Sequence, residues 1–126
     1  EELFRNVVAG DGHGIFQGQI KVAQPAQKTD AQMACNTLLL TDEGDFSAKP
    51  ELEIFADDVL CAHGATMTDI DDEHMFYLKA RGIDEKTARS LLIKAFVDEV
   101  VEDLDAGETM EEVLTGIIDT WLDKNI

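Results

Sequence analysis

The chain has 126 residues, 44% of them apolar, which is enough for one packed domain or for a sheet region with a helical appendage. Its formal net charge is −17, with eleven acids against four bases in residues 1–68 and sixteen against six in residues 69–126. Acid excess in both halves argues against nucleic acids and anionic membrane surfaces as partners and favours a basic protein surface.

Two cysteines, Cys35 and Cys61, are too few for a disulfide framework or for a four-thiolate site within one chain. No stretch approaches the roughly 18 apolar residues of a membrane helix, and no signal peptide is visible. The chain opens on Glu1 and a strand-like run. We therefore expect a piece of a longer protein from a reducing compartment.

Residues 15–68 have the alternation of β-strands. The run GIFQGQIKV places Phe16, Gly18, Ile20 and Val22 on one face, and three further runs follow: ACNTLLL, PELEIF and DDVLCAHGATM. Turn signals separate the runs at 25–26, 41–45 and 56–58. Short strands without intervening helices fit a sandwich, a barrel or a stacked solenoid, and the spacing of the runs reveals no strict short repeat.

Residues 70–126 change to helical period, and we predict helices at about 71–80, 84–105 and 110–124. Asp71 or Asp72 caps the first helix, which Gly82 ends in left-handed geometry. Asp84 caps the second helix, which Gly107 ends, and Thr109 with Glu112 has the spacing of a capping box for the third. We expect two domains, 1–69 and 70–126.

The apolar residues of the second and third predicted helices keep helical spacing. In the second helix they are Ala88, Leu91, Leu92, Ala95, Phe96, Val100 and Leu104; in the third they are Met110, Val113, Leu114, Ile117, Ile118, Trp121 and Leu122. Such a stripe is either core or, in part, a docking surface for a partner protein.

Cys61 and His63 are the strongest candidates for chemistry. Two residues apart on a strand, they project from the same face, and a thiolate with an imidazole suits iron, zinc or an iron–sulfur unit. The simpler alternative is that Cys61 is a small buried hydrophobe and His63 a satisfied histidine. Cys35, on an earlier strand, has a similar alternative as an inert buried thiol.

Other polar residues favour structural roles. Asp57 and Asp58 are neighbours on a predicted strand entry and form a poor acid–base pair, so we predict side chains that bond local backbone amides in a turn. His13, in GDGHG, lacks the context of a phosphate loop and is predicted in a turn. His74, in an acidic helix start, is predicted to be solvated.

Three strings carry a resemblance to a known family: AQKTDAQMACNTLLL, KPELEIFADDVLCAHGAT and DEHMFYLKARGID. Together they resemble, in family order and from about Phe16 to Phe96, the C-terminal part of the SufB/SufD family of iron–sulfur cluster assembly proteins. The Cys-x-His-Gly-Ala-Thr form is most like the SufD branch. Cys35 departs from it, since SufD relatives often carry Asn there and SufB carries a functional cysteine at the corresponding place.

The resemblance implies a mostly β then α fold: the end of a right-handed parallel β-helix followed by a C-terminal domain of about three helices. It implies a scaffold without enzymatic activity that pairs edge to edge with SufB and docks the SufC ATPase through its helices. The resemblance also implies a transient iron–sulfur cluster that is assembled jointly with SufB, at His63 first and Cys61 second, with the role of Cys35 open; we expect none in the isolated chain. The expected location is the cytoplasm, or the plastid if the parent protein is from a plant or alga.

Two other functions stay open on the residues alone. A β-helix also hosts carbohydrate-active enzymes, although these need clustered carboxylates or bases in a groove. The chain could also be a protein-interaction fragment without a cluster role. A homodimer of the chain is a further expectation, because a truncated solenoid exposes unpaired strand edges.

Overall fold

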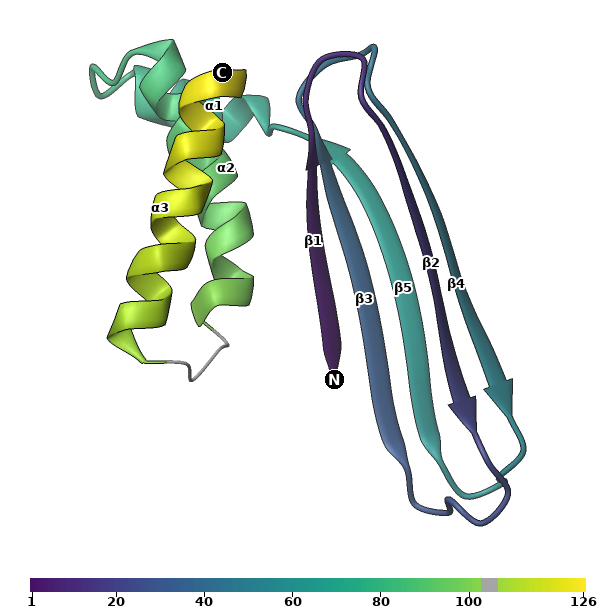
Figure 1. Cartoon of the computed structure of the whole chain (residues 1–126). Helices are drawn as coiled ribbons and strands as arrows, with labels where there is room; N and C mark the ends of the chain where they lie inside the picture. Colours follow the sequence, from purple (N-terminus) through teal and green to yellow (C-terminus); the bar gives the residue numbers. More distant parts are fainter. Residues whose placement is uncertain (103–106) are drawn as a thin grey trace.

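In the computed structural model, which describes residues 1–102 and 107–126, five strands precede three helices (Figure 1). β1 (Glu2–Val8), β3 (Asp30–Leu39) and β5 (Leu60–Asp69) form a three-stranded sheet in the order β1-β3-β5. β2 (His13–Val22) and β4 (Asp45–Ile54) form a two-stranded sheet. Successive strands thus alternate between two sheets, and every pairing is parallel.

The register is that of stacked coils of nearly constant length. In the three-stranded sheet Phe4 lies opposite Cys35 and Cys35 opposite Ala65, and in the two-stranded sheet Gly14 lies opposite Phe46. Residues that lie opposite each other on neighbouring strands are separated by nearly the same number of residues in every pair. This number, the length of one coil, lies within the range of known solenoid repeats. The prediction of a mostly β region followed by helices is confirmed, and parallel pairing favours stacked coils over an antiparallel sandwich.

The two sheets enclose an apolar cluster. Its buried members are Val8, Cys35 and Phe46, with Phe16, Leu39 and Ala48 packed against them. The rings of Phe4 and Phe16 meet across the sheets at a centroid distance of 4.7 Å. Gly14 carries no side chain because a Cβ there would collide with the Phe46 ring. The alternation predicted for residues 16–22 is confirmed, since Phe16, Gly18, Ile20 and Val22 are buried or half-buried while the residues between them are exposed.

The helices are α1 (Asp72–Lys79), α2 (Glu85–Glu102) and α3 (Glu108–Asn125). The Asp71 carboxylate caps α1 by accepting from the backbone N–H of Glu73 at 2.7 Å, and Asp84 accepts from the N–H of Thr87 at 3.0 Å. Gly82 has φ +84°, the left-handed geometry predicted for it. Residues 103–106, including the predicted Leu104, lie outside the described residues.

The predicted capping box of the third helix is wrong. Gly107, with φ +83°, is the N-cap of α3 and makes no side-chain cap hydrogen bond. Thr109 already lies inside the helix, so its hydroxyl comes too late in the chain to cap it. The N-cap position of α3 is therefore a glycine with positive φ, where a Thr cap was predicted.

The predicted inner face of α2 is also partly wrong. Ala88 is fully buried as expected, but Ile93, outside the predicted stripe, is 1% exposed, while Leu91 is 46% exposed. Apolar residues occur on several sides of this helix, so their spacing alone does not select the face that meets the sheet.

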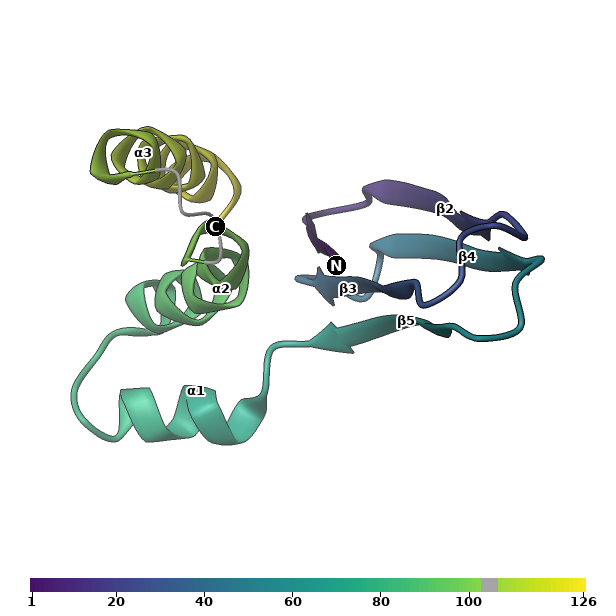
Figure 2. The ribbon, with the colours of Figure 1, turned by 90° about the horizontal axis from the view of Figure 1, so that it is seen from below.

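Helices α2 and α3 pack on the outer face of the three-stranded sheet. Leu38, Ile93 and Leu122 are the buried centre of this contact, extended by Val7, Leu40, Ile70, Phe96, Ile118, Trp121 and Ile126. Only Ile70 and Asp71 separate β5 from α1. Figure 2 shows α1 and β5 along one edge of the molecule, with α3 toward the opposite edge.

Candidate functional site

Cys61 and His63 lie on β5, the strand at one edge of the three-stranded sheet. Their alternate positions place both side chains on one side of the strand. Cys61 is half-buried and lies opposite Ala31; His63 is exposed and lies opposite Met33. The structure therefore brings the predicted pair to one face of an open edge.

Cys35 occupies the same face of the sheet one strand further in. It lies opposite Ala65, two residues beyond His63, which places the Cα atoms of Cys35 and His63 about 8 Å apart from strand spacing and rise. Its side chain is 0% exposed, and the Asn6 amide donates to its sulfur at 3.4 Å. Burial raises the pKa of the Cys35 thiol, and the Asn6 hydrogen bond offsets part of that rise. A neutral thiol among apolar side chains favours the core interpretation.

The free edge of β5 carries little protection against strand pairing. Its ten residues contain one carboxylate, Asp69 at the very end, together with His63. β4, the comparable edge of the two-stranded sheet, carries Lys49, Pro50, Glu51 and Glu53. Charges and a proline block the addition of another strand, and β5 lacks both over most of its length. The Lys49-Pro50 pair within β4 is a signal in the sequence that β4 is protected against strand pairing and β5 is not, and the sequence-based prediction did not use it.

The chain by itself offers few metal ligands. Among residues 1–102 and 107–126, no group of three or more His, Cys, Asp or Glu side chains is arranged to hold a metal ion. Cys61 and His63 together supply two donors, a thiolate and an imidazole, that suit iron or an iron–sulfur unit. A complete coordination shell at this edge requires donors from another source.

Comparison with known proteins identifies the family of the chain. The family model described as "SUF system FeS cluster assembly, SufBD core domain" matches residues 1–96, which include all five strands and Cys35, Cys61 and His63. The chain belongs to the SufBD family of iron–sulfur cluster assembly proteins. The family match ends within α2, so α3 lies beyond it.

Curated relatives include SufD, as predicted. The iron–sulfur cluster assembly protein SufD of Escherichia coli is 45% identical over 116 residues, 92% of this chain and 27% of that protein. The chloroplastic protein ABCI7 of Arabidopsis thaliana is 42% identical over 102 residues, 80% of this chain and 22% of that protein. A SufBD family protein of Synechocystis is 38% identical over 103 residues, 82% of this chain and 23% of that protein. The chain thus spans about a quarter of the length of these relatives.

Two predictions about polar residues of this SufBD chain need correction. His13 is the first residue of β2, not part of a turn, and its Nδ1 lies 2.8 Å from the carboxylate of Asp45 opposite it. Asp57 lies in a turn as predicted, but its carboxylate accepts from the Gln27 amide at 3.1 Å rather than from a local backbone amide. Asp58 likewise pairs with Lys28. In stacked coils the turn before β3 lies next to the turn before β5, and these side chains form bonds between the two turns.

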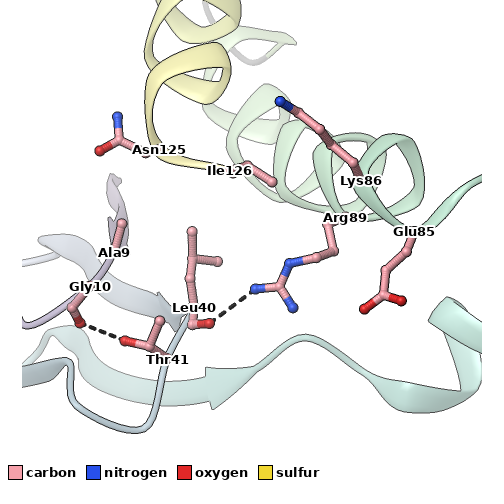
Figure 3. A pocket seen from close by; sticks show the side chains of 9 residues that line it. All are labelled: Ala9, Gly10, Leu40, Thr41, Glu85, Lys86, Arg89, Asn125 and Ile126. Atoms are coloured by element: carbon pink, nitrogen blue, oxygen red, sulfur yellow. Dashed lines mark hydrogen bonds between the residues drawn. The ribbon is translucent and has the colours of Figure 1, made fainter.

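A separate concavity, of about 380 Å³, lies where the strand turns meet the helices (Figure 3). Ala9, Gly10, Leu40 and Thr41 line one side, and the start of α2 with the chain's last two residues lines the other. Arg89 donates to the Leu40 carbonyl at 3.0 Å across it. The lining includes neither cysteine and no histidine, so this concavity is separate from the β5 edge.

The apolar stripe of α3 divides into two parts. Leu122 is buried and Leu114, Ile118 and Trp121 are half-buried, whereas Met110, Val113 and Ile117 are 50%, 54% and 61% exposed. The stripe is therefore core on one side and open surface on the other. No helix within the described ranges is long and apolar enough to cross a membrane.

Proposed function

We propose that this chain is the C-terminal part of a SufD-like scaffold subunit that assembles iron–sulfur clusters with SufB and the SufC ATPase. In this proposal residues 1–69 are the last coils of a right-handed parallel β-helix, and residues 70–126 are a helical domain. The observation that carries it is the position of Cys61 and His63 on one side of β5, an open and nearly uncharged edge strand.

The nascent cluster forms where the β5 edge pairs with SufB. Backbone pairing along β5 aligns the partner, and His63 contributes first and Cys61 second to the bound iron and sulfide. Two donors from this chain leave room for ligands from SufB, which supports a site shared between the two subunits. The cluster is the product that is handed on, and the isolated chain holds none.

The helical domain docks SufC. The exposed half of the α3 stripe, formed by Met110, Val113 and Ile117, supports an apolar contact, and the acidic surface around it favours a basic partner. ATP hydrolysis belongs to SufC, and the scaffold itself is not an enzyme. The complex works in the cytoplasm or in a plastid, the latter in line with the chloroplastic relative.

The test of the cluster site is His63→Ala in the full-length protein, with His13→Ala as a control exposed histidine outside β5. We expect anaerobic reconstitution of the complex with iron and sulfide to give a reduced visible absorption band for His63→Ala only. Co-purification of SufB and SufC stays unchanged in both variants. Normal cluster formation by the His63→Ala complex would exclude His63 from the site.

The test of the docking surface is Ile117→Lys, compared with Ile117→Met, which keeps the stripe apolar and leaves the acidic surface unchanged. A cation in the apolar stripe is expected to abolish capture of SufC, whereas the control retains it. Deletion of residues 70–126 should also abolish capture. SufC retention by the deletion variant would exclude the helical domain as its site.

A further inference from the structure

β5 differs from the other four strands in the contacts that hold it to the rest of the fold. Neither apolar cluster of the described residues includes a side chain from β5. On the helix-facing side, its rows opposite Asn36 and Leu38 hold Thr66 and Thr68. The strand that carries Cys61 and His63 therefore depends on its backbone pairing with β3 and on polar side-chain contacts.

One row of polar side chains crosses the whole three-stranded sheet. Arg5 lies opposite Asn36, and Asn36 lies opposite Thr66. With its amide oriented to satisfy both ends, Asn36 accepts from Arg5 Nη1 and donates to Thr66 Oγ1 at 3.2 Å and to the Cys35 carbonyl at 3.3 Å. A primary amide has distinct donor and acceptor ends, so the cation of Arg5 determines which end faces Thr66.

Arg5 itself is held by α2. Its guanidinium pairs with the Glu99 carboxylate and lies over the Phe96 ring, with Cζ 4.8 Å from the ring centroid. The Arg5 side chain is 11% exposed, and its Nε is buried without a hydrogen-bond partner among the described residues. A guanidinium fixed on two sides by one helix is a rigid donor for Asn36.

We propose that Glu99, Arg5, Asn36 and Thr66 form a polar ladder that positions β5 relative to α2. All four are positioning residues, since the candidate donors Cys61 and His63 lie on the opposite face of the strand. The ladder would fix the position of β5 relative to β3 and α2, and therefore the position of the free strand edge that carries Cys61 and His63. Its importance for cluster assembly rests on the proposed function, whereas its effect on β5 does not.

The first test is hydrogen–deuterium exchange of the intact protein with Thr66→Val, which keeps the shape of the side chain and removes the hydroxyl. Loss of one net hydrogen bond is expected to raise exchange across β5 about fivefold, while β1 and β2 keep their protection. Thr68→Val is the matched control, because the Thr68 hydroxyl bonds its neighbour's carbonyl at Asp69. Thr66→Ser, which retains the hydroxyl, is expected to restore protection.

The second test begins at the far end of the ladder. Glu99→Gln removes the charge that holds Arg5, and exchange at β5 is expected to rise although Glu99 lies on another element. Asp119→Asn, which breaks the 2.8 Å pair between α2 and α3 at Lys94, is the control and leaves β5 unchanged. Unchanged β5 exchange in both Thr66→Val and Glu99→Gln, or an equal rise in their controls, would overturn the ladder.

Cluster formation separates this proposal from the preceding one. If the ladder positions the site, Thr66→Val slows cluster formation in the SufB-containing complex and Thr66→Ser rescues it. If exchange responds as expected while His63→Ala has no effect on clusters, the ladder stands and the proposed site fails. If His63→Ala impairs assembly while exchange at β5 is constant, the site stands and the ladder fails.

Discussion

His63 and Met33 lie opposite each other on β5 and β3 and face the same side of the sheet, yet Met33 is 4% exposed while His63 is exposed. The difference arises because β3 has a neighbour on both sides and β5 has one. The inner face of the sheet thus continues from a sealed core to an open edge within a single strand spacing, about 4.8 Å. Side chains at that edge can be reached from outside without any rearrangement of the core.

The two cysteines are expected to differ in reactivity. Cys61 is half-buried at the edge, whereas Cys35 is sealed and its thiol has a raised pKa because burial disfavours the thiolate. Iodoacetamide at neutral pH should modify Cys61 in the folded protein and Cys35 only in denaturant. Mass spectrometry of tryptic peptides measures both sites. Rapid labelling of native Cys35 would contradict the packing described for it.

Cys35→Ala is expected to affect stability rather than assembly. The substitution removes one buried sulfur atom and should lower the free energy of unfolding by about 1 kcal/mol. Cluster formation by the complex should remain at the wild-type level. Cys61→Ala is the counterpart, with unchanged stability and weaker cluster formation. Loss of clusters in Cys35→Ala at preserved stability would make Cys35 a ligand.

Two glycine substitutions should have different costs. A Cβ at Gly14 collides with the buried Phe46 ring, while a Cβ at Gly64 meets nothing within 4 Å. Gly14→Ala is expected to lower the free energy of unfolding by about 1–3 kcal/mol, and Gly64→Ala to change it by less than about 0.5 kcal/mol. Urea denaturation followed by circular dichroism gives both values. Equal changes in the free energy of unfolding for the two variants would contradict the contact between Gly14 and the Phe46 ring.

Acid should loosen the start of α2 through Asp84. The Thr87 hydroxyl, at 2.6 Å, and the Thr87 backbone N–H hold the pKa of Asp84 below its usual value. A depressed folded-state pKa means that this stabilisation is present above the unfolded-state pKa, about 3.9, and is lost as pH falls through the folded-state value.

Asp84→Asn keeps a capping oxygen and removes the titration, so its thermal midpoint should fall less steeply than wild type below about pH 4. Circular dichroism melts between pH 6 and pH 2 measure the difference. Asp71→Asn should behave in the same way, because backbone N–H groups of Glu73 and His74 lower the pKa of Asp71. Identical acid slopes for wild type and Asp84→Asn would remove Asp84 from the acid transition.

Local signals in the sequence predicted the local structure well. Alternation identified the inward positions of β2, and short polar side chains identified Asp71 and Asp84 as caps because capping depends on residues within one turn. The pairing of strands one full coil apart was not predictable in this way, since turns of different length separate the runs. Without that spacing, the place of Cys35 relative to His63 stayed open.

Faces of the helices were harder to predict than their existence. α2 has apolar residues on several sides, so only the sheet decides that Ile93 is buried and Leu91 exposed. The glycine neighbours of His13 predict a turn, whereas the structure pairs His13 with Asp45 on β4, which lies one coil further along the chain. Both errors have one cause: the deciding contact is remote in sequence.

The nearly constant length of the coil sets the step in which this architecture can change size. Inserting one residue inside β3 ahead of Cys35 would exchange inward and outward positions for the rest of the strand, turning Cys35 toward the helices and Asn36 into the core. Inserting a whole coil would instead add one rung and leave every side chain on its own face. We therefore expect insertions and deletions to be tolerated in the turns, or as complete coils, but not as single residues within a strand.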